Sequence, residues 1–591
     1  MGTVLGSLCP SQLALGAIAE GCVDSILQYL PQLVPWLIAT LADQKSLIRS
    51  ITCWTLSRYS KWVTEQADQS SYLQPMMQEL LKRVLDHNKK VQEAACSAFA
   101  TLEEDAGNLL VPYIGPILQN LIFAFSKYQQ KNLLILYDAI GTLADAVGGA
   151  LNTPEHVGVL LPPLVERWNG ITDDDKSLFP LLECFTSIAQ ALGPGFTTFA
   201  QPVFTRCVAL IDSTLRHEQQ NVDVDKEFIV CSLDMISGMT EGMGAAVAPF
   251  VKQTQLPMYL LACMKDAMPD VRQSAYALVG DIAKACIEEL AAVLPEYLPL
   301  LTEQLDHRTV SVCNNASWAI GELAIKMGPS MQPYVEGVLA KLVPIINKHE
   351  EVNKSLVENT AITLGRLGLV CPEVGAPHLE HFIKPWCMAL RSIRDDIEKD
   401  HAFQGLCRML RINPRAPLMH MAELFDAFAS WTQPPEVCSL RARVVRASCA
   451  RLLRALAAHL CILCTPVSMP PHLRTLPFVC MPPDLARPCA RPCACPCATH
   501  ACHACMPRMH ATHACHACMP RMHATYAYAC ATHACHACMY ARLSRELQAL
   551  ATEMKQIIDG YGSSLPPDQW QAFLQTLAPD LRRRLHEKFG L

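Results

Sequence analysis

The chain has 591 residues, of which 51% are hydrophobic and 18% charged, so it holds enough apolar side chains to bury a large core. Its net charge of −6 is unevenly distributed, because residues 435–542 carry +9 and the rest of the chain carries −15. An acidic folded part argues against nucleic acid as the main ligand and favours a basic one.

Cysteine usage and the lack of sorting signals indicate the compartment. Of the 29 cysteines, 16 lie in 435–542, and the others are scattered singly in apolar runs, as expected for buried thiols of a cytosolic or nuclear protein. The start of the chain has no basic region typical of a secretory signal. The least polar stretch, Ala455–Cys464, is too short to span a bilayer. We therefore expect a protein of cytoplasm and nucleus without a membrane segment.

Self-similarity dominates the first three quarters of the chain. Residues 1–22 are predicted to hold part of a helix from an incomplete repeat, and repeats fill 23–434. Each repeat has a turn, an aliphatic start and then a helix with small and large apolar residues alternating by turn. The starts are Ile48, Val91, Asn132, Ser177, Phe228, Val271, Val312 and Leu356.

The spacing of these starts identifies the repeat class. Successive starts are 43, 41, 45, 51, 43, 41 and 44 residues apart, which matches HEAT or armadillo repeats. A first helix is expected to end near a proline-containing turn in each unit, as at Leu30-Pro31 and Leu294-Pro295. The prediction is an all-α HEAT-repeat superhelical solenoid.

Fixed positions of the second helix carry charged and aromatic residues. Offsets of six, ten and thirteen from the start differ by four and three residues, so they share one helix face. At offset six stand Trp54, Ser97, Asp138, Glu183, Asp234, Ala277, Trp318 and Ile362. Offset ten holds Arg58, Asp281 and Glu322, and offset thirteen holds Glu104, Asp145 and Glu241.

Stacking these helices produces an acidic stripe with a tryptophan near each end. Carboxylates attract and orient Lys and Arg, and an indole face can hold an apolar side chain. The pattern predicts a concave groove for an extended basic peptide. Two plainer interpretations remain open: the acids are simply solvated, and each tryptophan belongs to the core.

Several of these segments resemble the transportins, nuclear import receptors of the karyopherin-β family. The resemblance spans about residues 15–434 and is closer to the second transportin paralogue. The segments that carry it are Ile51–Tyr59 (ITCWTLSRY), Val91–Glu104 (VQEAACSAFATLEE), Lys131–Asp145 (KNLLILYDAIGTLAD), Val312–Glu322 (VCNNASWAIGE) and Glu358–Gly368 (ENTAITLGRLG).

The resemblance implies a C-terminal arch that binds basic nuclear localisation signals of the proline-tyrosine type. Trp54 and Arg58 would contact the proline-tyrosine end of the signal, and Trp318 and Asn314 its N-terminal part. The acids that would neutralise its basic residues are Glu104, Asp138, Asp145, Glu183, Asp234 and Asp281. The implied partners are cargo proteins carrying such signals, RNA-binding proteins among them, and nucleoporins, with no cofactor.

The sequence departs from the family in two places. The family's long N-terminal half, which binds the GTPase Ran, does not precede residue 15, so Ran-driven cargo release is not expected of this chain. Family-like sequence also stops near Pro434 and resumes at about 543, where 543–591 resembles the C-terminal helices of the family. Residues 435–542 therefore look like an insert.

The insert repeats a Cys- and His-rich unit. The residues 498–510 recur without change at 511–523, giving the pairs Cys502/Cys505 and Cys515/Cys518. The spacing suits zinc or copper, but the segment lacks the apolar residues that surround a structural metal. It is therefore interpreted as a disordered, translated simple-sequence repeat, and no metal site is predicted.

No catalytic grouping is recognisable. There is no His-Glu-x-x-His, and Gly242-Met-Gly244 is expected to end a helix and not to cradle a phosphate. The protein is predicted not to be an enzyme. The alternatives to cargo binding are a HEAT scaffold for protein assembly and metal binding by the insert.

Overall fold

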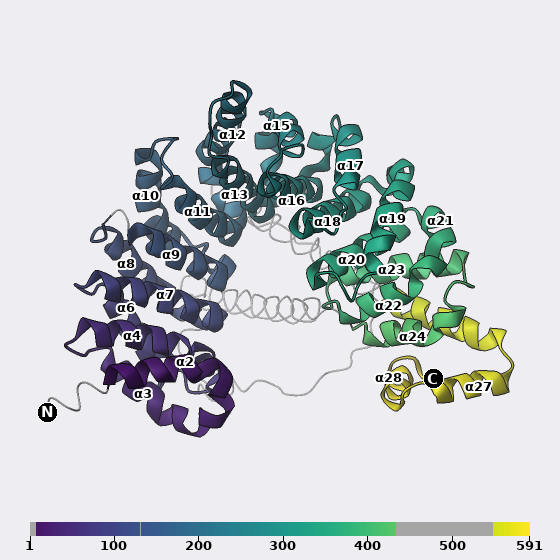
Figure 1. Cartoon of the computed structure of the whole chain (residues 1–591), viewed down its shortest axis with the longest axis horizontal. Helices are drawn as coiled ribbons and strands as arrows, with labels where there is room; N and C mark the ends of the chain where they lie inside the picture. Colours follow the sequence, from purple (N-terminus) through teal and green to yellow (C-terminus); the bar gives the residue numbers. More distant parts are fainter. Residues whose placement is uncertain (1–7, 130–131, 433–547) are drawn as a thin grey trace, which may run out of the picture. The chain divides into compact units, whose positions relative to one another are not determined.

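The computed structural model describes residues 8–129, 132–432 and 548–591, and every regular element in these ranges is a helix (Figure 1). The all-α prediction is confirmed. The chain divides into two compact units, one of 1–394, 398–431 and 557–591, the other of 395–397 and 432–556. The Cys- and His-rich stretch, 435–542, lies outside the described residues.

The helices of the first unit alternate between two layers. The first layer contains α3 (Leu30–Thr40), α6 (Leu73–Val84), α8 (Ile114–Phe125), α10 (Pro154–Gly170), α12 (Thr197–Gln219), α15 (Leu256–Cys263), α17 (Leu294–Glu303), α19 (Gln332–Ile346) and α22 (Ile383–Ser392). The second layer contains α2 (Leu8–Ile26), α4 (Ser46–Ser57), α7 (Lys89–Ala106), α9 (Leu133–Val147), α11 (Leu178–Leu192), α13 (Glu227–Met243), α16 (Pro269–Cys286), α18 (Val310–Met327) and α20 (Lys354–Val370).

The remaining helices are mostly short or follow these two layers. They are α5 (Ser60–Glu65), α14 (Ala248–Lys252), α21 (Pro372–Gly375), α23 (Ile397–Ile412), α24 (Met421–Ser430), α27 (Pro567–Thr576) and α28 (Pro579–Phe589). Near the C-terminus, α28 packs on α24.

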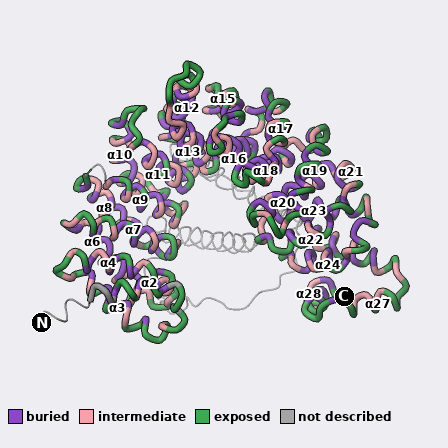
Figure 2. The backbone as a smooth tube through the Cα atoms, in the orientation of Figure 1, coloured by how far each residue is buried: buried purple, intermediate pink, exposed green. Residues whose placement is uncertain are grey.

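Each second-layer helix packs on the next, from α2 through to α20. Leu, Ile, Val and Ala fill the space between the layers, and the buried positions follow the sides of the helices that face one another (Figure 2). Every repeat thus buries its apolar faces against its neighbours, as solenoid repeats do.

The predicted repeat starts are confirmed. All eight lie in the first turn of a second-layer helix or, for Asn132 and Ser177, at its N-cap. The expectation that first helices end at proline turns is wrong. Pro31 and Pro295 instead occupy the first turns of α3 and α17, where the missing N–H needs no partner.

Glycines with positive φ end five second-layer helices. Each is the C-cap residue, has φ between 49° and 56°, and leads into a 3-10 turn; they are Gly107, Gly148, Gly193, Gly244 and Gly328. Only glycine adopts this backbone without strain, which explains why a sequence reading places a helix end at Gly244.

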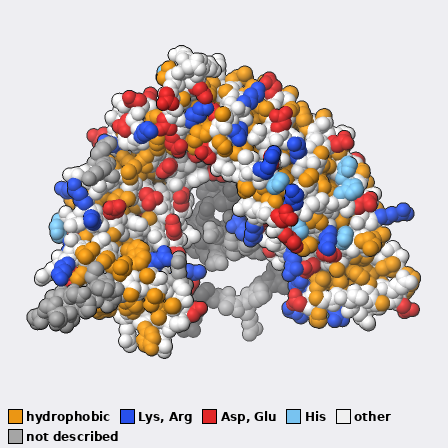
Figure 3. Space-filling view, viewed as in Figure 1, with side chains coloured by type: hydrophobic (Ala, Val, Ile, Leu, Met, Phe, Trp, Pro, Cys, Tyr) orange, Lys and Arg blue, Asp and Glu red, His pale blue; other side chains and the backbone are white. Residues whose placement is uncertain are grey.

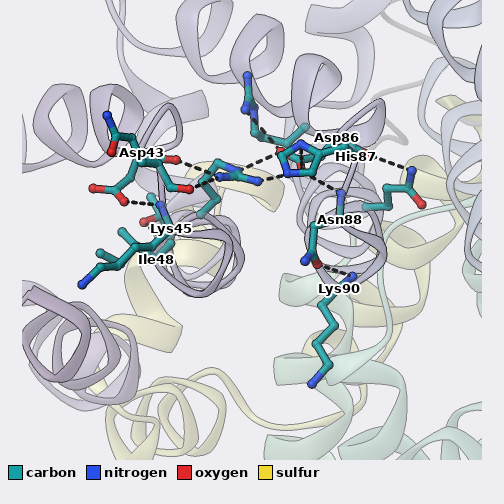
Figure 4. Close-up of polar contacts among 12 residues, drawn as sticks. Asp43, Lys45, Ile48, Asp86, His87, Asn88 and Lys90 are labelled. Carbon is teal, nitrogen blue, oxygen red and sulfur yellow. Dashed lines mark hydrogen bonds and ion pairs between the residues drawn. The ribbon is translucent and has the colours of Figure 1, made fainter.

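A buried ion pair between Arg49 of α4 and Asp86 ties α4 to the loop before α7. Asp86 accepts two hydrogen bonds of 2.8 Å from the Arg49 guanidinium and one of 2.9 Å from the Asn88 N–H, contacts that converge on Asp86 in Figure 4. Arg49 also donates to the carbonyl oxygens of Asp43 and Gln44. Both charged side chains are almost fully buried, with 4% and 1% exposed.

Two described segments, Lys89–Phe125 and Leu133–Leu151, are long and apolar enough by composition to cross a membrane. They contain α7, α8 and α9, which pack against one another and against their neighbours in the array. Their most apolar windows are one third and one half buried inside the protein. The same apolarity is therefore explained by the core of the repeats.

Candidate functional site

The ten predicted site residues lie on consecutive second-layer helices. We call the side of these helices that carries them the second-layer face. It is formed by Trp54 on α4 and Arg58 at its C-cap, Glu104 on α7, Asp138 and Asp145 on α9, Glu183 on α11, Asp234 on α13, Asp281 on α16, and Asn314 and Trp318 on α18.

The two tryptophans mark distant positions on this face. The Trp54 side chain is 39% exposed and that of Trp318 is half-buried, so each indole presents surface to solvent. Five second-layer helices, α7 to α16, lie between them. The structure therefore keeps the two indoles apart, and a ligand that touches both has to be an extended chain.

Three of the predicted acids meet in one pocket between α9 and α11. Asp138, Asp145 and Glu183 line a cavity of about 130 Å³. The Ser187 hydroxyl, from α11, donates to Asp145 at 3.0 Å. Acidic side chains gather over α9, α11 and α13 in Figure 3. A pocket of this size and charge suits one cationic side chain.

Three acids of this region have raised pKa values, mainly because the packed helices around them displace water. Burial raises the pKa of Glu183, and the negative charges of Glu227, Asp138 and Asp234 raise it further. Partial desolvation also raises the pKa values of Asp145 and Asp234, although both side chains remain exposed. Within the described ranges, no Lys, Arg or His forms an ion pair with these carboxylates. Their negative charge is therefore uncompensated by the protein itself.

Asp281 differs from these acids because its side chain is almost completely shielded from solvent, whereas Asp145, Glu183 and Asp234 are exposed. Its side chain accepts a hydrogen bond from the Ser237 hydroxyl, and only 5% of the residue is exposed. Burial raises its pKa to about 7, the Ser237 bond opposes the rise, and the charges of Glu241 and Glu322 add to it. The expectation of a surface carboxylate, which rested on helix periodicity, is wrong at this position because α13 packs against it.

Asp281 gives the folded chain a pH-dependent stability. Its pKa lies above its ordinary value of 3.8, so the folded protein holds a proton that the unfolded chain has lost between those pH values. This contribution is complete below about pH 4 and is lost as the pH rises to about 7, by at most about 1.4 kcal/mol per pH unit. Asp281→Asn should gain stability relative to wild type across this window, then keep a constant advantage.

Melting temperatures measured from pH 4 to 9 check this expectation. Asp223→Asn, which changes an exposed loop carboxylate, is the matched control. Parallel curves for wild type and Asp281→Asn would contradict the assignment.

The structure adds residues that the sequence patterns did not single out. Arg366 on α20 is buried and forms ion pairs with Glu322 at 2.8 Å and Glu398 at 3.0 Å. Asn359, also on α20, donates through its Nδ2 to the Asn314 side-chain oxygen at 3.0 Å. Asn359 stands three residues after its repeat start, and Asn314 stands two residues after its own. This near agreement in repeat position is the sequence signal that could have identified Asn359.

Two models of protein families match the chain. One is described as importin subunit beta-1-like TPR repeats and matches residues 39–285, and the other is a HEAT-like repeat that matches 13–59 and 269–323. The HEAT prediction is confirmed by the second. A solved structure of importin beta shares the fold, with a TM-score of 0.51 at 15% identity, covering 67% of this chain and 55% of that one.

Curated relatives are much more similar in sequence. Transportin-1 of Homo sapiens is 53% identical over 431 residues, which cover 72% of this chain and 48% of the relative. Importin subunit beta-2 of Schizosaccharomyces pombe is 44% identical over 468 residues, covering 72% and 51%. The chain thus spans about half the length of the curated relatives it matches. The closer similarity to the second transportin paralogue stays a prediction.

Proposed function

The chain belongs to the importin-β family, as a homologue of the transportins, and on that premise we propose that it is a nuclear transport receptor whose second-layer face binds basic proline-tyrosine-type localisation signals. Its relatives bear the names of transport receptors, which agrees with the expectation that the protein is not an enzyme. In this function the protein reversibly binds a segment of a cargo protein while the cargo moves between cytoplasm and nucleus.

One observation carries this proposal: uncompensated acids lie between two solvent-facing indoles on consecutive helices. Asp145, Glu183 and Asp234 all have raised pKa values and form no ion pair within the described ranges. Desolvation disfavours the ionised form of all three, and cationic side chains placed next to them favour it and form charge-assisted hydrogen bonds. A basic, extended peptide is the ligand that supplies such cations at the spacing of the helices.

The parts of the signal can be assigned to the face in order. We place the proline-tyrosine end at Trp54 and Arg58, and the N-terminal part at Trp318 and Asn314. Its basic residues lie along the acids in between, with one of them in the pocket of Asp138. Ran and nucleoporins, which the family resemblance implies as further partners of a complete receptor, are likewise proposals for this chain.

Neutralising two acids of the pocket tests the electrostatic part of the proposal. Asp138→Asn/Asp145→Asn is expected to weaken binding of a fluorescent proline-tyrosine signal peptide about 10- to 100-fold at low salt, because each charged contact contributes about 1 kcal/mol or slightly more. The loss should shrink as ionic strength rises, since salt screens exposed charges. Fluorescence anisotropy titrations at several salt concentrations measure both effects.

A matched control removes the same charge from the other layer. Glu296 on α17 and Glu336 on α19 are exposed first-layer residues, so Glu296→Gln/Glu336→Gln changes the net charge equally. This variant should bind like wild type. Equal weakening by both double variants would show that the peptide responds to total charge and does not lie on the second-layer face.

A further inference from the structure

Each tryptophan of the second-layer face rests on a glycine of the preceding second-layer helix. Trp54 lies against Gly16 of α2, and Trp318 lies against Gly280 of α16. A Cβ atom added to either glycine would lie 3.0 Å or less from three atoms of the indole, Cε3, Cζ3 and Cη2. Real Cβ atoms essentially never approach that closely, so the rings occupy the space that any other residue would need.

The two contacts share the same geometry although they are far apart in the chain. The same three ring atoms are involved, and the glycine precedes its tryptophan by 38 residues in both cases. Agreement at two independent sites indicates a recurring seat for an indole between successive repeats. Gly280 stands nine residues after its repeat start, Val271, and Trp318 stands six residues after the start of the next repeat, Val312.

Backbone conformation does not require glycine at either position. Gly16 and Gly280 lie inside α2 and α16 and are not among the glycines with positive φ. Alanine favours the interior of a helix over glycine. We therefore attribute glycine at these two positions to the neighbouring indole, which occupies the space that a Cβ atom would need.

Gly141 shows what this register looks like without a tryptophan. It occupies the position of Gly280 in its own repeat, and Glu183 takes the place of the tryptophan in the next one. A Cβ atom at Gly141 would lie 3.6 Å from the Ser187 hydroxyl oxygen and 3.7 Å from the Cys184 Cα, which are ordinary contacts.

Gly321 and Gly365 stand at the same position, and a Cβ atom there would collide with Thr363 and Ala402. Close approach therefore recurs at this position, and what distinguishes Gly280, like Gly16, is that the neighbour is an indole.

We propose that Gly16 and Gly280 are positioning residues for ligand binding, which seat the indoles of Trp54 and Trp318 against the preceding helix and leave their other surfaces to the cargo peptide. The inference rests on the proposed function of the second-layer face. An indole held in one orientation before the ligand arrives loses little conformational freedom on binding. With alanine beneath it, the ring has to tilt away and no longer presents the same surface.

Peptide binding tests the inference at Gly280. Gly280→Ala is expected to weaken the binding of a fluorescent proline-tyrosine signal peptide at least about tenfold. The same variant should bind wild-type-like to a peptide whose apolar N-terminal part is replaced by Gly and Ser, because that peptide does not use Trp318. Gly141→Ala, the matched control, should bind both peptides like wild type. Wild-type affinity of Gly280→Ala for the complete peptide would overturn the inference.

A double-variant cycle separates positioning from general damage. Trp318→Ala removes the ring, so Gly280→Ala/Trp318→Ala should bind no more weakly than Trp318→Ala alone. Its melting temperature should equal or exceed that of Trp318→Ala, because alanine then favours the helix with nothing to collide with. If Gly280→Ala does not fold, the double variant should still fold. Additive losses in affinity and melting temperature would refute the indole seat.

The outcomes distinguish this inference from the proposed function. If folded wild type does not bind the signal peptide, the proposed function fails, and the melting-temperature cycle still decides whether the glycine seats the indole. If wild type binds and Trp318→Ala weakens binding while Gly280→Ala does not, the function stands and the inference alone fails. Gly16→Ala with Trp54→Ala repeats the cycle at the other end of the face.

Discussion

Replacing Trp54 and Trp318 together by alanine is expected to weaken binding of a proline-tyrosine signal peptide by about a thousandfold. Truncating an interface tryptophan that acts as an anchor costs about 2 kcal/mol or more, or about 30-fold each. The two residues are separated by five second-layer helices, so their effects should add. The double variant therefore has a larger expected effect than removal of charges along the face.

The control for this variant comes from the same chain. Trp36 on α3 is 41% exposed, nearly the same as Trp54 at 39%, but it belongs to the first layer. Trp36→Ala should bind the peptide like wild type. Anisotropy titrations of all variants, with circular dichroism to establish folding, give the comparison. A folded Trp54→Ala/Trp318→Ala protein with wild-type affinity would remove the tryptophans from the site.

Breaking the buried ion pair between the first repeats should have the largest effect on stability. Arg49→Met leaves the Asp86 carboxylate buried with reduced compensation, since only the contact of Arg83 at 3.3 Å and that of the exposed His87 remain as ion pairs. We expect a loss of roughly 3 kcal/mol, the lower end for breaking a buried pair, because Arg83 and His87 still contact Asp86. Hydrogen exchange of α4 and α7, together with thermal unfolding, measures it.

The pH dependence of this effect has a definite sign. Burial alone would raise the pKa of Asp86, but the hydrogen bonds from Arg49 and Asn88 outweigh burial and hold it below its ordinary value. The stabilisation is therefore present above about pH 4, where the unfolded carboxyl is ionised, and is lost as the pH falls through the folded pKa. The difference between wild type and Arg49→Met should shrink in acid.

Two further variants make the ion-pair prediction specific. Arg49→Met/Asp86→Asn should be less destabilised than Arg49→Met, because the uncompensated charge is gone while an oxygen for the Asn88 N–H remains. Arg308 forms an ion pair with Asp306 in a comparable loop, but its side chain is 81% exposed. Arg308→Met should therefore leave stability unchanged. Equal losses for Arg49→Met and Arg308→Met would contradict the role of burial.

The sequence alone determined the repeat and the face. Helices of this length need a periodic apolar stripe, so the 41- to 51-residue spacing located the eight second-layer helices from α4 to α20. The shared offset of six residues gave Trp54, Asp138 and Trp318 the same position in their repeats. Local chemistry also marked helix ends such as Gly244, since positive φ selects glycine. The prediction that helices end at prolines was wrong because the first turn of a helix accepts proline as readily as a loop turn does.

Only the tertiary structure decided what surrounds each of these side chains. Burial depends on the neighbouring helix, so Asp234 is exposed while Asp281, on the next helix of the layer, is buried against Ser237. Arg366 forms its ion pairs with residues of other helices, and Trp318 packs on a glycine of the preceding repeat. The period of a single helix does not predict such contacts. Contacts between repeats arise from packing, and packing is a property of the folded array.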